Sequence, residues 1–144
     1  MFDASNQATI FVPMLAIVAL TFVAFIRMAQ MRGAAVKGGH PAEYYKAHLG
    51  APEPEATVVA IRHYANMFEL PTVFYPACLT AFVTGGVGMW TLVFAWAYVA
   101  ARTVQSVVHL TSNNTNVRGG MFVLGVLCIL ALWVNVAMAV CGKL

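Results

Sequence analysis

Long runs without a charged side chain constrain this chain more than any other feature. Residues 9–26 and 121–140 contain no charged residue, and the one strongly polar side chain within them is Asn135. A helix needs about 20 apolar residues to cross the hydrocarbon of a bilayer, where the backbone must satisfy its own hydrogen bonds. Only 9% of the 144 residues are charged, against about a quarter in soluble domains. The chain is therefore predicted to be an all-α integral membrane protein.

Turn signals between the apolar runs predict how many helices there are. Residues 28–54 are rich in charge, glycine and proline, which predicts a solvated connection. Pro54 lies between two glutamates and suits the start of a helix, and Gly85-Gly86 suits a helix end. The predicted helices cover residues 8–27, 55–83, 87–110 and 120–141. They form one domain over residues 1–144, an up-down bundle of four helices.

The distribution of Lys and Arg predicts the orientation in the membrane. The connections after the first and third helices carry most of the basic residues, whereas the opposite side has only Lys143. Cytoplasmic loops are enriched in Lys and Arg. Both basic connections are thus expected in the cytoplasm, with both termini on the other side.

Two of the predicted helices are too short unless they include polar residues. The strictly apolar parts cover only residues 70–83 and 87–101, short of the roughly 20 residues needed. Extension towards the cytoplasm adds Asn66 and Glu69 to the second helix, with Arg62 at the interface, and adds Arg102 and Gln105 to the third.

The added residues fall on one stripe of each helix. Helical spacing aligns Arg62, Asn66 and Glu69, and it also aligns Arg102, Gln105 and His109. Both stripes lie at the cytoplasmic end because the helices are antiparallel. The two stripes are expected to face each other or a neighbouring subunit.

The charges on these stripes require partners. A charged side chain inside the bilayer costs about 2.5 to 3.5 kcal/mol on insertion scales. One interpretation is that Glu69 pairs with Arg62 or Arg102. One carboxylate cannot neutralise two guanidinium groups, however, and Arg27 at the same level adds further positive charge. The second interpretation is an anionic ligand, and glutathione fits because it carries two carboxylates, one ammonium and a thiol.

Residues 62–71 carry a motif with a known counterpart. The pattern Arg-x-x-x-Asn-x-x-Glu, followed closely by Pro71, resembles the second-helix signature of the MAPEG superfamily, the membrane-associated proteins in eicosanoid and glutathione metabolism. Residues 101–109, with Asn116 and Arg118 beyond them, are similar to the third-helix segment of bacterial members. The resemblance implies a homotrimer in a bacterial inner membrane, with glutathione held between subunits near the cytoplasmic side. It assigns glutathione contacts to Arg62, Asn66, Glu69, Arg27 and Arg102.

The chain departs from better-known members of that superfamily. Gln105 and His109 stand where leukotriene C and prostaglandin E synthases have tyrosines, and Asn116 aligns near their thiol-activating arginine. We expect Gln105 and His109 to contribute to ligand binding. Only the thiolate is a good nucleophile, and Arg118 is the cation predicted to stabilise it.

Two classes of function remain open from the sequence. The first is a glutathione-dependent transferase or peroxidase acting on lipophilic substrates that enter from the surrounding lipid. The alternative is a noncatalytic protein of the same fold that binds an anionic ligand or lipid, or an accessory subunit of a membrane complex. We predict no metal site and no nucleic-acid partner, and we expect His63 and Tyr64 to contact lipid or a neighbouring subunit.

Overall fold

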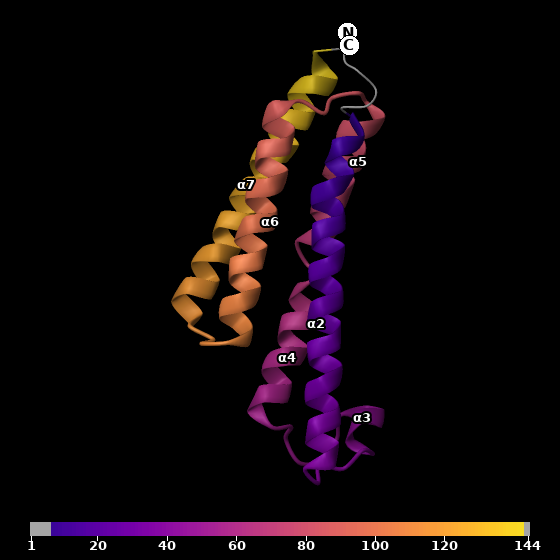
Figure 1. The fold of residues 1–144 in the computed structure, drawn as a ribbon, viewed down its shortest axis with the longest axis vertical. Coiled ribbons are helices and arrows are strands. Elements are labelled where there is room, and N and C mark those ends of the chain that lie inside the picture. The colour runs from indigo at the N-terminus through magenta and orange to yellow at the C-terminus, as the bar shows by residue number, and fades with distance from the viewer. Residues whose placement is uncertain (1–6, 143–144) are drawn as a thin grey trace.

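The structure, a computed structural model, describes residues 7–142, in which all the regular elements are helices joined by turns and loops. A 3-10 turn, η1, leads into the first long helix, α2. Three short helices follow in the chain, and then two long helices, α6 and α7. The elements are η1 (Ala8–Ile10), α2 (Phe11–Lys37), α3 (Tyr44–Ala47), α4 (Glu55–Asn66), α5 (Pro71–Val83), α6 (Met89–Leu110) and α7 (Thr115–Cys141). In Figure 1, α2 runs beside α4 and α5, while α6 and α7 form a second antiparallel pair. The first and last described residues lie at the same end of the bundle.

Three segments are long and apolar enough to cross a membrane. They are Ala8–Lys37, Met89–Leu110 and Thr115–Cys141. The remaining pair, α4 with 12 residues and α5 with 13, is too short to cross as separate helices. The all-α fold class is confirmed, whereas four uninterrupted helices are not found in the described part.

The predicted single helix over residues 55–83 is wrong, because a turn at residues 67–70 divides it. Pro71 opens α5 and has no N–H to donate back along the chain. The preceding residues tighten into 3-10-type bonds, with Met67 N donating to Tyr64 O at 3.0 Å and Phe68 N donating to Ala65 O at 2.9 Å. The proline therefore ends α4 and begins α5.

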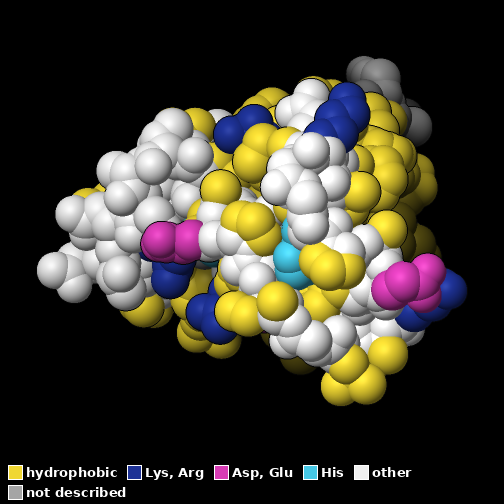
Figure 2. Space-filling model, turned by 90° about the horizontal axis from the view of Figure 1, so that it is seen from below, with side chains coloured by type: hydrophobic (Ala, Val, Ile, Leu, Met, Phe, Trp, Pro, Cys, Tyr) yellow, Lys and Arg dark blue, Asp and Glu magenta, His cyan; other side chains and the backbone are white. Residues whose placement is uncertain are grey.

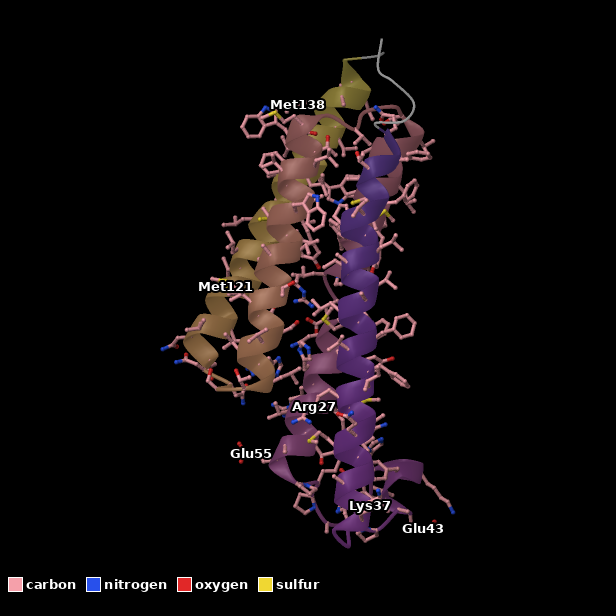
Figure 3. All side chains as sticks on the ribbon, in the orientation of Figure 1. Arg27, Lys37, Glu43, Glu55, Met121 and Met138 are labelled. Carbon is pink, nitrogen blue, oxygen red and sulfur yellow. The ribbon has the colours of Figure 1, made fainter. Side chains whose placement is uncertain are left out.

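The first helix also differs from its prediction. It continues ten residues past Arg27 to Lys37 and ends at the glycine pair, where Gly39 adopts a positive φ of 98°. Residues 28–37 contain helix-forming alanines and methionines and only one glycine, so charge alone did not end the helix. As a result α2 extends below the α6–α7 hairpin, and Arg27, Lys37, Glu43 and Glu55 lie in this lower region (Figure 3).

The last helix begins at Thr115, five residues earlier than predicted. Asn114 caps it, since its Oδ1 accepts hydrogen bonds from the backbone N–H groups of Asn116 and Val117 at 3.0 and 3.2 Å. Arg118 consequently lies within the first turns of α7.

The core joins α5, α6 and α7. Phe74, Tyr98 and Leu132 are fully buried. Gly125 lies under the Tyr98 ring, and a Cβ there would be 3.6 Å from the ring carbons, at ordinary van der Waals contact. Trp133 Nε1 donates to the carbonyl of Val73 at 3.2 Å and ties α7 to α5.

The connection between α2 and α4 forms a polar and aromatic surface at the lower end. The Arg32 guanidinium lies 5.2 Å from the centre of the Tyr45 ring, and Lys46 pairs with Glu43 at 2.6 Å. Partial burial and the nearby Glu53 carboxylate raise the pKa of Tyr45. Seen from this end, Lys and Arg side chains surround the face and histidine is visible near its middle (Figure 2).

Leu132→Ala should lower the free energy of unfolding by about 2 to 5 kcal/mol, because it opens a cavity in a fully packed site. Leu130→Ala on the same helix is the control, since Leu130 is 56% exposed and Leu132 is 0% exposed. Denaturation of the detergent-solubilised protein, followed by circular dichroism, measures both. Equal losses for the two variants would contradict this packing of α7.

Candidate functional site

The polar stripe of α4 points out of the protomer. Arg62 and Glu69 are exposed, and Asn66 between them is half-buried. With its amide nitrogen turned toward Glu69, Asn66 donates to the two carboxylate oxygens at 3.0 and 3.2 Å. Within residues 7–142 the one salt bridge joins Lys46 to Glu43, so neither Arg62 nor Glu69 forms one there, although the Glu69 carboxylate lies close enough to Arg102 to interact with it electrostatically.

The stripe of α6 points inward instead. Arg102, Gln105 and His109 are 1%, 4% and 2% exposed, and Tyr98 extends the same face by one turn. Arg102 lies eight residues before the end of α6, which is about 12 Å along the helix. The expectation that the two stripes face each other is therefore wrong within the protomer.

Arg102 links the two helices through the backbone. Its Nη2 donates to the carbonyl of Asn66 at 2.5 Å, and its Nη1 donates to Gln105 Oε1 at 2.6 Å. In a continuous helix the carbonyl of Asn66 would accept from the N–H of Leu70, but the turn leaves it only a long bond of 3.5 Å from Glu69 N. The break at Pro71 thus exposes an acceptor that the buried guanidinium uses.

A histidine pair continues this internal polar face toward the C-terminal end of α6. His63 on α4 is 3% exposed, and its ring centre lies 5.0 Å from that of His109. The expectation that His63 contacts lipid or a neighbour is wrong, because residue 63 faces α6 while the stripe beside it faces outward. The buried residues Thr57, Ala60, His63 and Met67 recur at helical spacing. The same spacing is visible in the sequence and indicates which face of α4 is buried.

Three buried polar atoms on this internal face make no hydrogen bond within the described part of the chain. They are Tyr98 Oη, Arg102 Nε and His109 Nδ1. Buried polar atoms are nearly always hydrogen-bonded in proteins. These three atoms can therefore still form hydrogen bonds, and they lie on the face of α6 that carries the buried Arg102 guanidinium.

A polar cavity of about 370 Å³ opens near the C-terminal end of α6, on the same face. Its wall includes Arg27 and Met31 of α2, Glu55 and Val59 of α4, and His109 and Asn113 near the end of α6. Arg118 lies beside it, since its Nη1 donates to Asn113 Oδ1 at 2.6 Å. Arg27, His109 and Arg118 are thus brought to one region, which is separate from the outward stripe of α4.

The family model described as the MAPEG family matches residues 10–138. The chain belongs to the MAPEG family. No curated protein and no solved structure gave a significant match.

Membership explains the membrane-spanning helices and places the chain among membrane-associated proteins of eicosanoid and glutathione metabolism. The chain is an integral membrane protein of this MAPEG kind. In this member the α6 positions predicted to replace the tyrosines, Gln105 and His109, are buried inside the protomer. Gln105 serves as an acceptor for Arg102.

Gln105→Leu should lower the free energy of unfolding by about 1 to 3 kcal/mol, because it leaves a buried charged donor without its acceptor. Gln105→Glu should preserve stability, since a carboxylate keeps an acceptor at the same place. Val104→Ala is the control on the neighbouring exposed position. Chemical unfolding in detergent measures all three, and an unchanged stability in Gln105→Leu would show that Arg102 does not depend on this bond.

Proposed function

We propose that this MAPEG protein is a glutathione-binding enzyme of the bacterial inner membrane that transfers glutathione to lipophilic substrates or reduces lipid hydroperoxides. Family membership supports the class of metabolism. The outward stripe of Arg62, Asn66 and Glu69 supports glutathione binding in particular. We further propose that both termini lie on the non-cytoplasmic side.

The stripe supports a zwitterionic ligand because neither Arg62 nor Glu69 forms a salt bridge in the described protomer, where Arg102 acts on Glu69 only through space. Arg62 and Glu69 are both exposed, and the half-buried Asn66 between them donates to Glu69. Leaving such charges unpaired in or beside hydrocarbon is costly. A ligand with both carboxylates and an ammonium satisfies them together.

In the proposed complex each ligand group has a stated residue. The ammonium binds Glu69, and a carboxylate binds Arg62, since a guanidinium matches carboxylate geometry. Arg102 lies behind the Asn66 peptide, so its positive charge acts on the ligand from inside the protomer. Gln105 and His109 lie on the same buried face of α6 as Arg102. In the proposed complex they form the inner side of the site, next to the polar cavity.

A homotrimer follows from the same exposure. The stripe needs cover from lipid, and a neighbouring copy provides it. Arg27 is exposed on α2 and is unpaired among the described residues. A second copy would bring its Arg27 to the stripe, where it binds the second carboxylate of glutathione.

Glu69→Gln should weaken glutathione binding by about 10- to 100-fold, which corresponds to one lost hydrogen bond to a charged group. Isothermal titration of the detergent-solubilised protein measures the affinity. Glu43→Gln is the control, because Glu43 is also exposed but pairs with Lys46. Native mass spectrometry should give the same trimeric mass for parent and variants. Unchanged affinity in Glu69→Gln would make this carboxylate structural.

Arg118→Ala should abolish thiolate formation while glutathione still binds, because Arg118 lies apart from the stripe of its own protomer and is proposed to reach the sulfur from a neighbouring copy in the trimer. The ultraviolet difference spectrum on adding glutathione reports the thiolate. S-methylglutathione is the control ligand, since it has no ionisable thiol. A signal retained in Arg118→Ala would transfer the role to Arg62 or Arg102. Binding without any signal in the parent would favour the noncatalytic alternative.

A further inference from the structure

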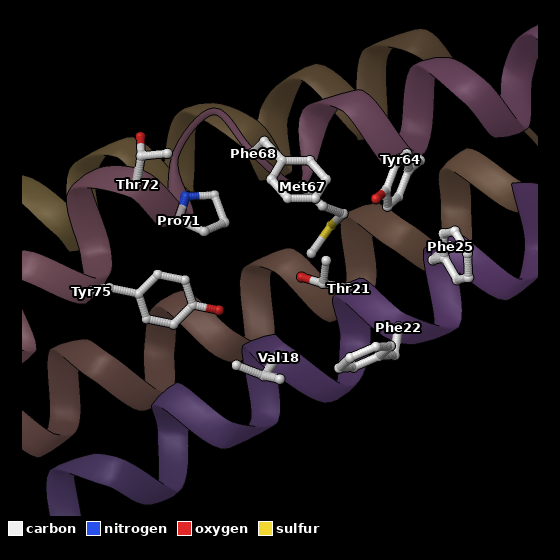
Figure 4. Close-up of a pocket in the computed structure, with 10 residues that line it drawn as sticks. All are labelled: Val18, Thr21, Phe22, Phe25, Tyr64, Met67, Phe68, Pro71, Thr72 and Tyr75. Atoms are coloured by element: carbon white, nitrogen blue, oxygen red, sulfur yellow. The ribbon is translucent and has the colours of Figure 1, made fainter.

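Met67 lies in the turn between α4 and α5 and contacts two different surroundings. On one side it lines a groove of about 390 Å³, together with Val18 and Thr21 of α2. Figure 4 shows the end of its side chain directed toward Thr21 across this groove. On the other side its sulfur accepts a hydrogen bond from Arg102 Nη2 at 3.6 Å. The Met67 thioether therefore joins the groove to the buried guanidinium.

The groove is open to lipophilic molecules rather than to water. Its walls include Phe22, Phe25 and Phe68, and its α2 wall belongs to a membrane-spanning segment, so lipid chains adjoin it. Met67 itself is only 2% exposed. An oxidant that dissolves in the membrane therefore reaches Met67 more readily than one that dissolves in water.

The chemistry of the thioether is what makes this position notable. Methionine is oxidised to methionine sulfoxide, which turns an apolar side chain into a polar one. Arg102 beside the sulfur is 1% exposed, and a charge acts more strongly on its neighbours in a protein interior than in water. The guanidinium therefore stabilises negative charge that develops on an oxygen next to the sulfur.

We propose that Met67 is a modification site, where an organic hydroperoxide in the groove oxidises the sulfur and Arg102 promotes the reaction. A sulfur lone pair attacks the distal oxygen of the hydroperoxide, and an S–O bond forms as the O–O bond breaks. The hydroperoxide proton moves to the departing oxygen, which leaves as an alcohol. The sulfur loses two electrons and the hydroperoxide gains them. Arg102 stabilises the departing oxygen and then donates from Nη2 to the sulfoxide oxygen.

Oxidation at Met67 connects the groove to the turn that carries Asn66 and Glu69. The sulfoxide oxygen gives Arg102 a second oxygen acceptor beside the Asn66 carbonyl, to which the same Nη2 already donates. The oxidant belongs to one of the substrate classes proposed above, but the oxidation needs no glutathione. Met67 therefore acts as an internal marker of hydroperoxide that reaches the groove.

Three methionines of the parent protein test the proposal without any substitution. Met14 lines a neighbouring apolar groove of about 590 Å³ and is half-buried, but within the described residues no guanidinium donates to its sulfur. Met28 is buried, with 8% exposed, and does not line the Met67 groove. The full-length protein in detergent is treated with cumene hydroperoxide without glutathione, and peptide mass spectrometry follows each sulfoxide. Met67 should be oxidised about tenfold faster than Met14 and Met28, the rate effect of one hydrogen bond to a charged group.

Thr21→Trp should slow the oxidation of Met67, because the indole fills the groove opposite its side chain, and should leave the oxidation of Met14 unchanged. Val134→Trp is the matched control. Val134 lines a groove between α6 and α7, and its replacement should change none of the rates. Circular dichroism verifies that each variant is folded. The comparison of the three methionines in the parent still decides the proposal if Thr21→Trp does not fold.

Three results would overturn the proposal. Oxidation of Met67 no faster than that of Met14 would show that Arg102 does not promote the reaction. Equal rates at Met67 and Met28 would show that the groove does not deliver the oxidant, and an unchanged rate at Met67 in folded Thr21→Trp would show the same. Because glutathione is absent, none of these results bears on the proposed glutathione site.

Discussion

The contact between the Arg102 guanidinium and the Asn66 carbonyl organises the rest of the structure. A guanidinium inside a membrane bundle requires acceptors, and a continuous helix offers no free backbone carbonyl. The break before Pro71 separates α4 from α5 and exposes one, at 2.5 Å from Arg102 Nη2. Gln105 supplies the other acceptor from one turn along α6. Pro71, Gln105 and Arg102 therefore act together, and the guanidinium donates to a backbone carbonyl where a carboxylate would be the usual acceptor.

This arrangement decides which charges are available for function. Arg102 donates to Asn66 O and Gln105 Oε1, and its charge acts on Glu69 without a salt bridge, so the Glu69 carboxylate stays exposed at the turn. The break thus separates a structural cation from a pair of outward charges. In a membrane that pair is stable only when a ligand or another subunit covers it, which is why the proposed site and the proposed trimer depend on each other.

The same break shapes the surfaces on either side of α4. Its inward face carries His63 and Met67 against α6, and a polar cavity opens beside Arg27 and His109 near the end of α6. Its opposite face, with Tyr64, borders the apolar groove against α2. A short helix joined to another by a turn can therefore present an ionic surface, an internal polar contact and a lipid-facing groove within about two turns.

The sequence by itself determined the membrane class, the approximate positions of the helices and the residues of the MAPEG motif. These follow from local properties, namely runs of apolar residues, turn signals and helical spacing. It did not determine the division of the second helix, although Pro71 was visible, because prolines are tolerated in membrane helices when neighbours satisfy the freed carbonyls. Nor did it place Arg102 and His63 inside, since their partners are a backbone carbonyl and a second histidine that lie 36 and 46 positions away. Only the packing of α4 against α6 could decide which face of each helix is buried.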